Sequence, residues 1–185
     1  EIAEGILPEL RRARLIVNYE VIGRSDDQIL DQYKEDASKL SIEELLYGAN
    51  MLIEDVATRK QWYEQIIKLF PNDYRAYNNL AQIAIMEGNT TVAQGWLQKA
   101  KNVNSRGAEV NANMAVLALK SGDTAKAEVL MAQASGSDTF NEILGNLNIA
   151  KGNYTQAQHN LADTQTNSAA LAMILNNDYA SAQKT

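Results

Sequence analysis

The chain has 185 residues, a length that suits one domain or one array of repeats. Its formal charge is −6 and its sequence pI is about 4.9, whereas a protein that binds nucleic acid through the phosphates needs a positive surface. The small basic cluster of Arg11, Arg12 and Arg14 does not supply one, so we expect no nucleic-acid partner. The absence of cysteine excludes disulfides, thiolate metal sites and cysteine nucleophiles. Because no apolar run approaches about 18 residues, we also expect no membrane span.

Residues 1–23 differ from the rest of the chain. Between residues 15 and 22 apolar and polar side chains alternate, and this period of two predicts a β-strand that ends at Gly23. A single strand cannot satisfy its own backbone, so we expect this N-terminal arm to pair with another copy of the chain or to fold back. The residues on the apolar face of the predicted strand are Leu15, Val17, Tyr19 and Val21.

Three helices are expected next. Ser25 with Gln28, and Ser41 with Glu44, have the spacing of a capping box, which predicts a connecting helix within residues 24–39 and a second helix from Ser41 to about Leu52. A third helix is predicted from Asp55 to Phe70, because Pro71 then stops it.

From residue 74 onward, small and large residues recur with a fixed period of 34. Such a period is typical of stacked helical hairpins. The matching pairs are Leu80 and Met114, Ala81 and Ala115, Ala84 and Ala118, Gly88 and Gly122, Ala93 and Ala127, Leu97 and Met131, and Ala100 and Ala134.

The repeat divides residues 40–185 into five units. The first unit is degenerate, since Glu54 stands where later units have glycine, although Leu46, Tyr47, Tyr63 and Ile66 fall on its apolar positions. The fourth unit follows the third by 30 residues, which places a four-residue shortening near Gly136. The predicted units are 40–73, 74–107, 108–137, 138–162 and the partial unit 163–185.

Each unit has the same turn between its two helices. Gly88, Gly122, Gly152 and Asn177 are expected to end the first helix in the left-handed conformation. The Asn or Asp that follows (Asn89, Asp123, Asn153 and Asp178) is expected to cap the second helix.

This pattern of large residues, alanines and a turn glycine resembles the tetratricopeptide repeat family. The unit 74–107 carries the resemblance most fully. The resemblance implies an all-α fold, a right-handed superhelix of about four helical hairpins that holds other proteins on its surface. The residues of this unit that match are Tyr77, Leu80, Ala81, Gly88, Ala93, Leu97 and Ala100.

The N-terminal segment has a weaker resemblance. Residues 7–22 look like the closing strand of an OmpA-like domain of bacterial envelope proteins. This resemblance implies that the chain is part of a longer cell-envelope protein, located in the periplasm or associated with the outer membrane. Without this resemblance, the expected location is the cytoplasm. It assigns no ligand-binding residue to this chain.

In the tetratricopeptide family the first helices of the units line a concave groove. The resemblance places neutral amides there, such as Asn78, which can bond a peptide backbone, and apolar side chains such as Met86. Family members that grip a C-terminal carboxylate resemble this chain at Asn78 and Asn113, but Thr139 and Ile143 stand where they need Lys or Arg, so we do not expect that ligand. The candidate groove residues are Arg75, Asn78, Gln82, Ile85, Met86, Glu109, Ala112, Asn113, Val116, Leu119, Lys120, Thr139, Glu142, Asn146, Ile149 and Ala150.

Catalytic chemistry has little support. His159 is the only histidine and is expected on an outward helix face, without the partners of a triad or a metal site. No phosphate-binding glycine loop occurs. The acidic pairs, such as Asp26 with Asp27, lie near helix starts, where the helix dipole favours negative charge. We therefore expect no enzyme, no cofactor and no metal.

The sequence thus predicts a non-catalytic scaffold that binds a peptide or protein segment in the groove. The alternative is a structural spacer or oligomerisation module that positions an upstream domain and has no ligand in the groove. The residues named above would then only solvate one face or pack against a neighbouring unit.

Overall fold

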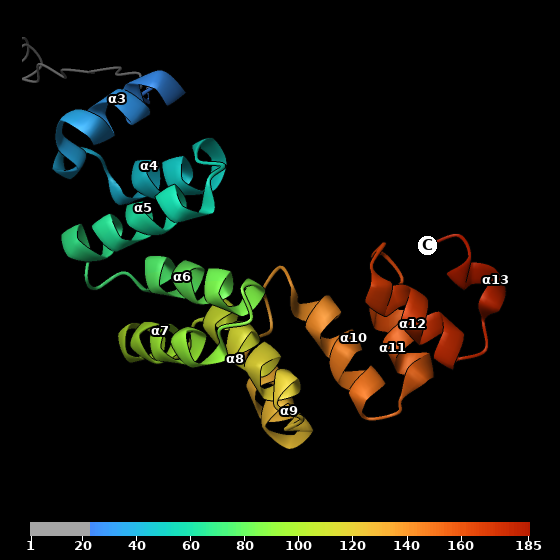
Figure 1. Ribbon diagram of the computed structural model, residues 1–185. Coiled ribbons are helices and arrows are strands. Elements are labelled where there is room, and N and C mark those ends of the chain that lie inside the picture. The colour runs from blue at the N-terminus through green and yellow to red at the C-terminus, as the bar shows by residue number, and fades with distance from the viewer. Residues whose placement is uncertain (1–22) are drawn as a thin grey trace, which may run out of the picture.

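The computed structural model describes residues 23–185, and within this range the chain consists of helices and the turns that join them, without a strand. Figure 1 shows these helices as one curved row, from α3 in blue to α13 in red. The all-α prediction is therefore confirmed for this part of the chain. The predicted strand over 15–22 and the OmpA-like segment lie outside the described residues, so both stay predictions.

Helix α3 (Asp26–Asp36) begins as its sequence predicts. The Ser25 hydroxyl accepts a hydrogen bond from the backbone N–H of Gln28, and the Gln28 side chain accepts one from the backbone N–H of Ser25. These reciprocal bonds satisfy two donors that the first turn leaves free. The short 3-10 helix η1 (Ala37–Lys39) follows and leads into the first helical pair.

The first helical pair departs from the pattern of the later ones. Helix α4 (Ile42–Tyr47) starts with the predicted Ser41–Glu44 capping box and then widens into the π-helix η2 (Gly48–Leu52). The predicted end near Leu52 is confirmed, but the π-helical turn was not foreseen. Glu54 lies in the loop to α5 (Val56–Leu69), where the later units have a glycine turn.

The later helices follow in antiparallel pairs. Their turns confirm the sequence prediction, because Gly88, Gly122, Gly152 and Asn177 all have positive φ, a conformation that costs other residues more than glycine or asparagine. The pairs are α6 (Tyr74–Met86) with α7 (Thr90–Val103), α8 (Ala108–Lys120) with α9 (Thr124–Met131), α10 (Phe140–Ala150) with α11 (Tyr154–Asn160), and α12 (Asn167–Leu175) with α13 (Tyr179–Ala182). The boundaries of the five units stay predictions.

The predicted caps hold at three of the four turns. Asn89, Asp123 and Asp178 each accept a backbone N–H of the helix that follows. The prediction was wrong for Asn153, whose side chain makes no cap bond. Its amide instead donates to the side-chain oxygen of the buried Asn148, 3.3 Å away. This bond gives the buried amide oxygen of Asn148 a donor.

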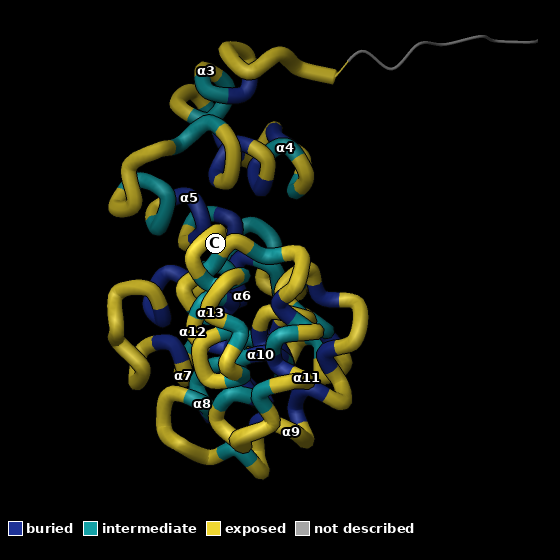
Figure 2. Tube along the Cα trace, turned by 90° about the vertical axis from the view of Figure 1, so that its right-hand side faces the viewer, coloured by how far each residue is buried: buried dark blue, intermediate teal, exposed yellow. Residues whose placement is uncertain are grey.

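Small side chains let the helices approach closely, as the repeat predicts. Ala81 and Ala115 are fully buried, and Gly145 is buried at the corresponding position of α10. The first helices α6, α8, α10 and α12 contact one another in this order. Figure 2 shows the buried residues on the inner sides of the helices, and exposed residues mainly on their outer sides and in the turns.

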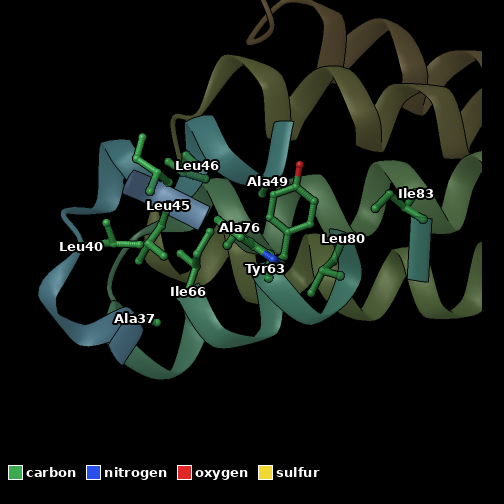
Figure 3. Close-up of a cluster of buried hydrophobic side chains, with 12 residues drawn as sticks. Ala37, Leu40, Leu45, Leu46, Ala49, Tyr63, Ile66, Ala76, Leu80 and Ile83 are labelled. Carbon is green, nitrogen blue, oxygen red and sulfur yellow. The ribbon is translucent and has the colours of Figure 1, made fainter. Parts of the chain in front are cut away.

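A hydrophobic cluster joins α3, α4, α5 and α6. Figure 3 shows Leu45, Tyr63, Ile66 and Leu80 converging in it. Trp62 is also buried there, and its ring stacks on Tyr33 of α3 with the ring centroids 3.7 Å apart. Helix α3 therefore packs on the first pair through an aromatic contact.

Tyr47 corrects one detail of the predicted core. The repeat placed it on an apolar position, yet its side chain is 43% exposed. Its hydroxyl donates to the carboxylate of Asp26, 3.1 Å away. The first unit is degenerate, so the 34-residue pattern did not give the correct orientation of Tyr47.

Helix α9 shows the shortening that the sequence placed near Gly136. It ends at Met131, and Gly136 then adopts a positive φ of 97° before α10 begins. None of the helices within residues 23–185 has the length and apolar character needed to cross a bilayer.

Candidate functional site

Two hollows lie side by side along the first helices. The Glu109 hollow has a volume of about 510 Å³ and is bordered by α4, η2, α6 and α8. The Met86 hollow has a volume of about 590 Å³ and is bordered by η2, α5 and α6. Because Asn50 and Asn79 line both hollows, the two form one continuous surface, which we call the groove.

Asn50 and Asn79 are held by hydrogen bonds at the boundary between the hollows. The side-chain oxygen of Asn50 accepts the hydroxyl of Tyr63 and the amide of Asn79. With its oxygen occupied, the exposed side chain of Asn50 has only its amide group left to offer a ligand. The π-helical turn supplies Asn50, and π-helical turns often occur at functional sites.

Asn78 carries the clearest unsatisfied bonding capacity in the groove. Its side chain is only 7% exposed, and its oxygen accepts the amide of Asn113 at 2.9 Å. Its own Nδ2 amide has no acceptor among the described residues, yet this nitrogen is not sealed from solvent. Asn78 is a lining residue of the Glu109 hollow, and its Nδ2 amide is a donor without an acceptor among the described residues.

The charged side chains of the Glu109 hollow are mainly acidic. Glu43, Glu109 and Asp138 line it, and Arg75 is the one cation among its lining residues. The guanidinium of Arg75 is held by Asp73 at 2.8 Å and by Glu43 at 2.9 Å. These carboxylates raise the pKa of Arg75 further above its usual value. Its charge is therefore already compensated, and the hollow retains the negative charge of Glu109 and Asp138.

The carboxyl group of Asp73, which binds Arg75, makes the stability of the fold depend on pH. Burial alone would raise the pKa of its carboxyl, but the bonds and charge of Arg75 outweigh burial and hold the pKa below 3.8. An acid with a lowered pKa stabilises the fold above its unfolded pKa, and this contribution is lost as the pH falls through the folded pKa.

We expect Arg75→Gln to remove this contribution. The free energy of unfolding of the variant should fall below that of the unaltered chain at neutral pH, and the difference should shrink once the pH drops below 3.8. Urea unfolding between about pH 7 and about pH 3 measures it. Arg59→Gln is the control, because Arg59 donates to the backbone oxygen of Ile53 rather than to a carboxylate. A difference for Arg75→Gln that is constant over this range contradicts the prediction.

The structure places five of the sequence-predicted residues on the groove. Arg75, Asn78 and Glu109 line the Glu109 hollow, and Gln82 and Met86 line the Met86 hollow. Asn113 contributes indirectly through its bond to Asn78.

The other predicted residues lie elsewhere. Ile85 and Ala112 are buried in the hydrophobic clusters, and Val116 and Leu119 are partly buried against these clusters. Lys120 lines a separate hollow. The remaining residues line neither hollow of the groove, although Glu142, Asn146, Ile149 and Ala150 are on α10 and Thr139 precedes it.

Sequence reasoning missed most of the other lining residues of the groove, such as Tyr47, Asn50, Met51, Asn79 and Asp138. Tyr47, Asn50 and Met51 belong to the degenerate first unit, whose groove positions could not be assigned from the repeat. The available signal was the amide pair Asn78–Asn79, since either amide could face the groove. Met51 is 69% exposed and lines the Glu109 hollow, so it offers apolar contact there.

A separate hollow of about 390 Å³ lies between α7, α8 and α9, lined by Gln94, Met114 and Lys126 among others. Of the predicted groove residues only Lys120 lines it, so we do not treat it as the functional site.

His159 lies exposed near the end of α11, as the sequence predicts. Among residues 23–185 no cluster of three or more His, Asp or Glu side chains is placed to hold a metal ion.

The comparisons with known proteins support the repeat fold. Residues 62–102 match the family model described as tetratricopeptide repeat. A thermophilic tetratricopeptide repeat protein of Thermus thermophilus, TTC0263, has a similar structure with a TM-score of 0.62. The two chains are 19% identical, and the match covers 86% of this chain and 89% of that one. A comparison with curated protein sequences finds no match.

These matches show the fold. The described part of the chain is an all-helical solenoid similar in fold to a tetratricopeptide repeat protein, and residues 62–102 match the model of that repeat. Repeats of this type generally mediate protein–protein interaction.

Proposed function

We propose that the chain is a non-catalytic interaction module that binds an extended peptide or protein segment in the groove. The unpaired Nδ2 amide of Asn78, a lining residue of the Glu109 hollow, is the observation that carries this proposal. A donor in that position suits a backbone carbonyl, and an extended segment presents such a carbonyl at every residue.

Apolar contact supports the same function. Met86 is 76% exposed at the Met86 hollow, and Met51 is exposed at the Glu109 hollow. Methionine adapts its shape to different partners and is common at binding surfaces. One exposed methionine at each hollow gives a bound segment apolar contact on both sides of the Asn50–Asn79 boundary.

We expect Met86→Ser to weaken binding at the groove. The experiment selects random capped dodecapeptides displayed on phage against the chain and then measures the selected peptides by fluorescence anisotropy. Burying a methionine side chain contributes ~1.5–3 kcal/mol, so the dissociation constant should rise by about tenfold or more.

Val129→Ser is the matched control, because Val129 is 63% exposed on α9 and lines neither hollow of the groove. It should leave the affinity of the same peptides unchanged. If no peptide is enriched, or if both variants bind as the unaltered chain does, the groove is not the binding site.

The second candidate function is that of a structural spacer or oligomerisation module. The C-terminal helices favour it, because Leu171, Ile174 and Tyr179 are exposed on α12 and α13. Analytical ultracentrifugation, together with the peptide selection, separates the two functions. A stable oligomer supports the second function if no selected peptide depends on Met86 for binding. A cell-envelope location, inferred only from the N-terminal segment, belongs to the same proposal.

A further inference from the structure

The charge of the Glu109 hollow indicates which charge a bound segment should carry. Three carboxylates line this hollow together with Arg75, whose guanidinium is engaged by Glu43 and by Asp73. Glu43 is thereby compensated. Glu109 accepts only the hydroxyl of Tyr74, at 3.1 Å, among the described residues, and Asp138 has no cationic partner there.

The neighbouring Tyr74 responds to this charge. Burial raises the pKa of its hydroxyl, and the carboxylate of Glu109 raises it further. The hydroxyl therefore remains a neutral donor and leaves the negative charge of Glu109 in place. A ligand carboxylate in this hollow would face Glu109 and Asp138 without a free cation to receive it, and like charges in contact are unfavourable.

The Asn78 amide favours a peptide segment over an inorganic cation. It is a donor in a residue that is more than nine-tenths buried, and Asn78 lines the same hollow as the carboxylates. A peptide segment supplies a carbonyl oxygen for this donor and, on a neighbouring residue, a cation for the carboxylates. An inorganic cation would satisfy only the carboxylates and would leave the amide unpaired.

The Met86 hollow adds apolar contact. Val56, Ile83 and Met86 line it, and Glu87 there pairs with Lys60 at 2.6 Å. Arg59 donates to the backbone oxygen of Ile53 and keeps its positive charge. The two hollows thus differ in charge, since the acidic side chains gather in the Glu109 hollow, and Asn50 and Asn79 join them.

We infer that the groove recognises an extended basic segment of another protein, with a lysine or arginine against Glu109 and Asp138 and an apolar side chain in the Met86 hollow. This inference rests on the proposed function and names the partner class for it. It excludes acidic segments and free C-terminal carboxylates as preferred ligands.

The test uses capped nonapeptides with an N-terminal fluorophore. Three of them repeat Thr-Lys-Val, Thr-Gln-Val or Thr-Glu-Val three times. A fourth peptide has the sequence of the glutamine peptide but an uncapped C-terminus, and it therefore has a free carboxylate. We expect the lysine peptide to bind about tenfold more tightly than the glutamine peptide at low salt, and this advantage should shrink as salt screens the charges. The glutamate peptide and the free carboxylate should bind more weakly than the capped glutamine peptide.

The double variant Glu109→Gln with Asp138→Asn should abolish the preference for lysine. The control is Glu64→Gln with Asp163→Asn, which changes the net charge equally at exposed positions that line neither hollow. The control should keep the preference, because overall charge alone does not create it. Circular dichroism spectra of both double variants check that the fold is retained.

The outcomes separate this inference from the proposed function. Equal affinity for the lysine and glutamine peptides, or a preference for the glutamate peptide, overturns the inference while Met86-dependent binding continues to support the groove. Met86-dependent phage peptides without lysine or arginine overturn it in the same way. If no peptide depends on Met86, the inference and the proposed function fail together.

Discussion

Replacing Trp62 with alanine is expected to destabilise the N-terminal end of the solenoid by ~3–5 kcal/mol, the cost typical of removing a buried tryptophan. Trp62 is buried in the cluster that joins α3, α4, α5 and α6, and its ring packs on Gly48 and stacks on Tyr33. Loss of the ring leaves a cavity and removes the aromatic contact that fixes α3. Urea unfolding followed by circular dichroism measures the loss.

The second tryptophan provides both the control and a local probe. Trp96 is only partly buried, with Lys99 over its ring, so Trp96→Ala should cost less than Trp62→Ala. The chain has two tryptophans, so fluorescence of the Trp62→Ala variant reports on α7 alone. Because repeats mainly contact their neighbours, we expect α7 to unfold at higher urea than the N-terminal helices. A Trp96→Ala variant that is equally or more destabilised contradicts the prediction.

Replacing Gly145 with alanine should destabilise the fourth unit by ~1–3 kcal/mol through overpacking. A Cβ atom on Gly145 would lie 2.4 Å from Cγ of Leu161. Leu161 is fully buried and cannot swing away, so α10 and α11 would have to separate. The free energy of unfolding from urea titration checks this.

Gly95 is the matched control for this substitution. It lies within α7, and a Cβ atom there would meet no neighbour within 4 Å. Gly95→Ala should stabilise the chain by ~0.5–1 kcal/mol, because alanine loses less backbone entropy in a helix. In the double variant Gly145→Ala with Leu161→Ala, the total loss should be smaller than the sum of the two single losses. Additive losses would show that the two side chains do not compete for the same space.

The sequence predicted the helices from α3 to α13 because each boundary has a local cause. The capping boxes at Ser25 and Ser41, the stop at Pro71 and the turn glycines all act within a few residues. Fully buried alanines followed from the period alone, because close helix packing repeats as the units do.

The groove was predicted only in part. Arg75, Asn78 and Met86 were found because their unit follows the repeat closely. Asn50 and Met51 were missed because the π-helical turn changes which side chains face the groove, and the repeat contains no signal for that turn. Which atoms of an amide remain available to a ligand also depends on residues distant in the chain. The side chain of Asn113 donates to the oxygen of Asn78 and leaves only the nitrogen of Asn78 free.

The shared border of Asn50 and Asn79 has a consequence for folding. The two residues belong to neighbouring hairpins. A ligand that spans both hollows would contact both hairpins and stabilise their packing on each other. Local opening would then require the ligand to leave, so occupancy should lower the amide hydrogen exchange of α4, α5 and α6 in proportion to ligand concentration. Binding at the groove would therefore also stabilise the N-terminal end of the solenoid against local unfolding.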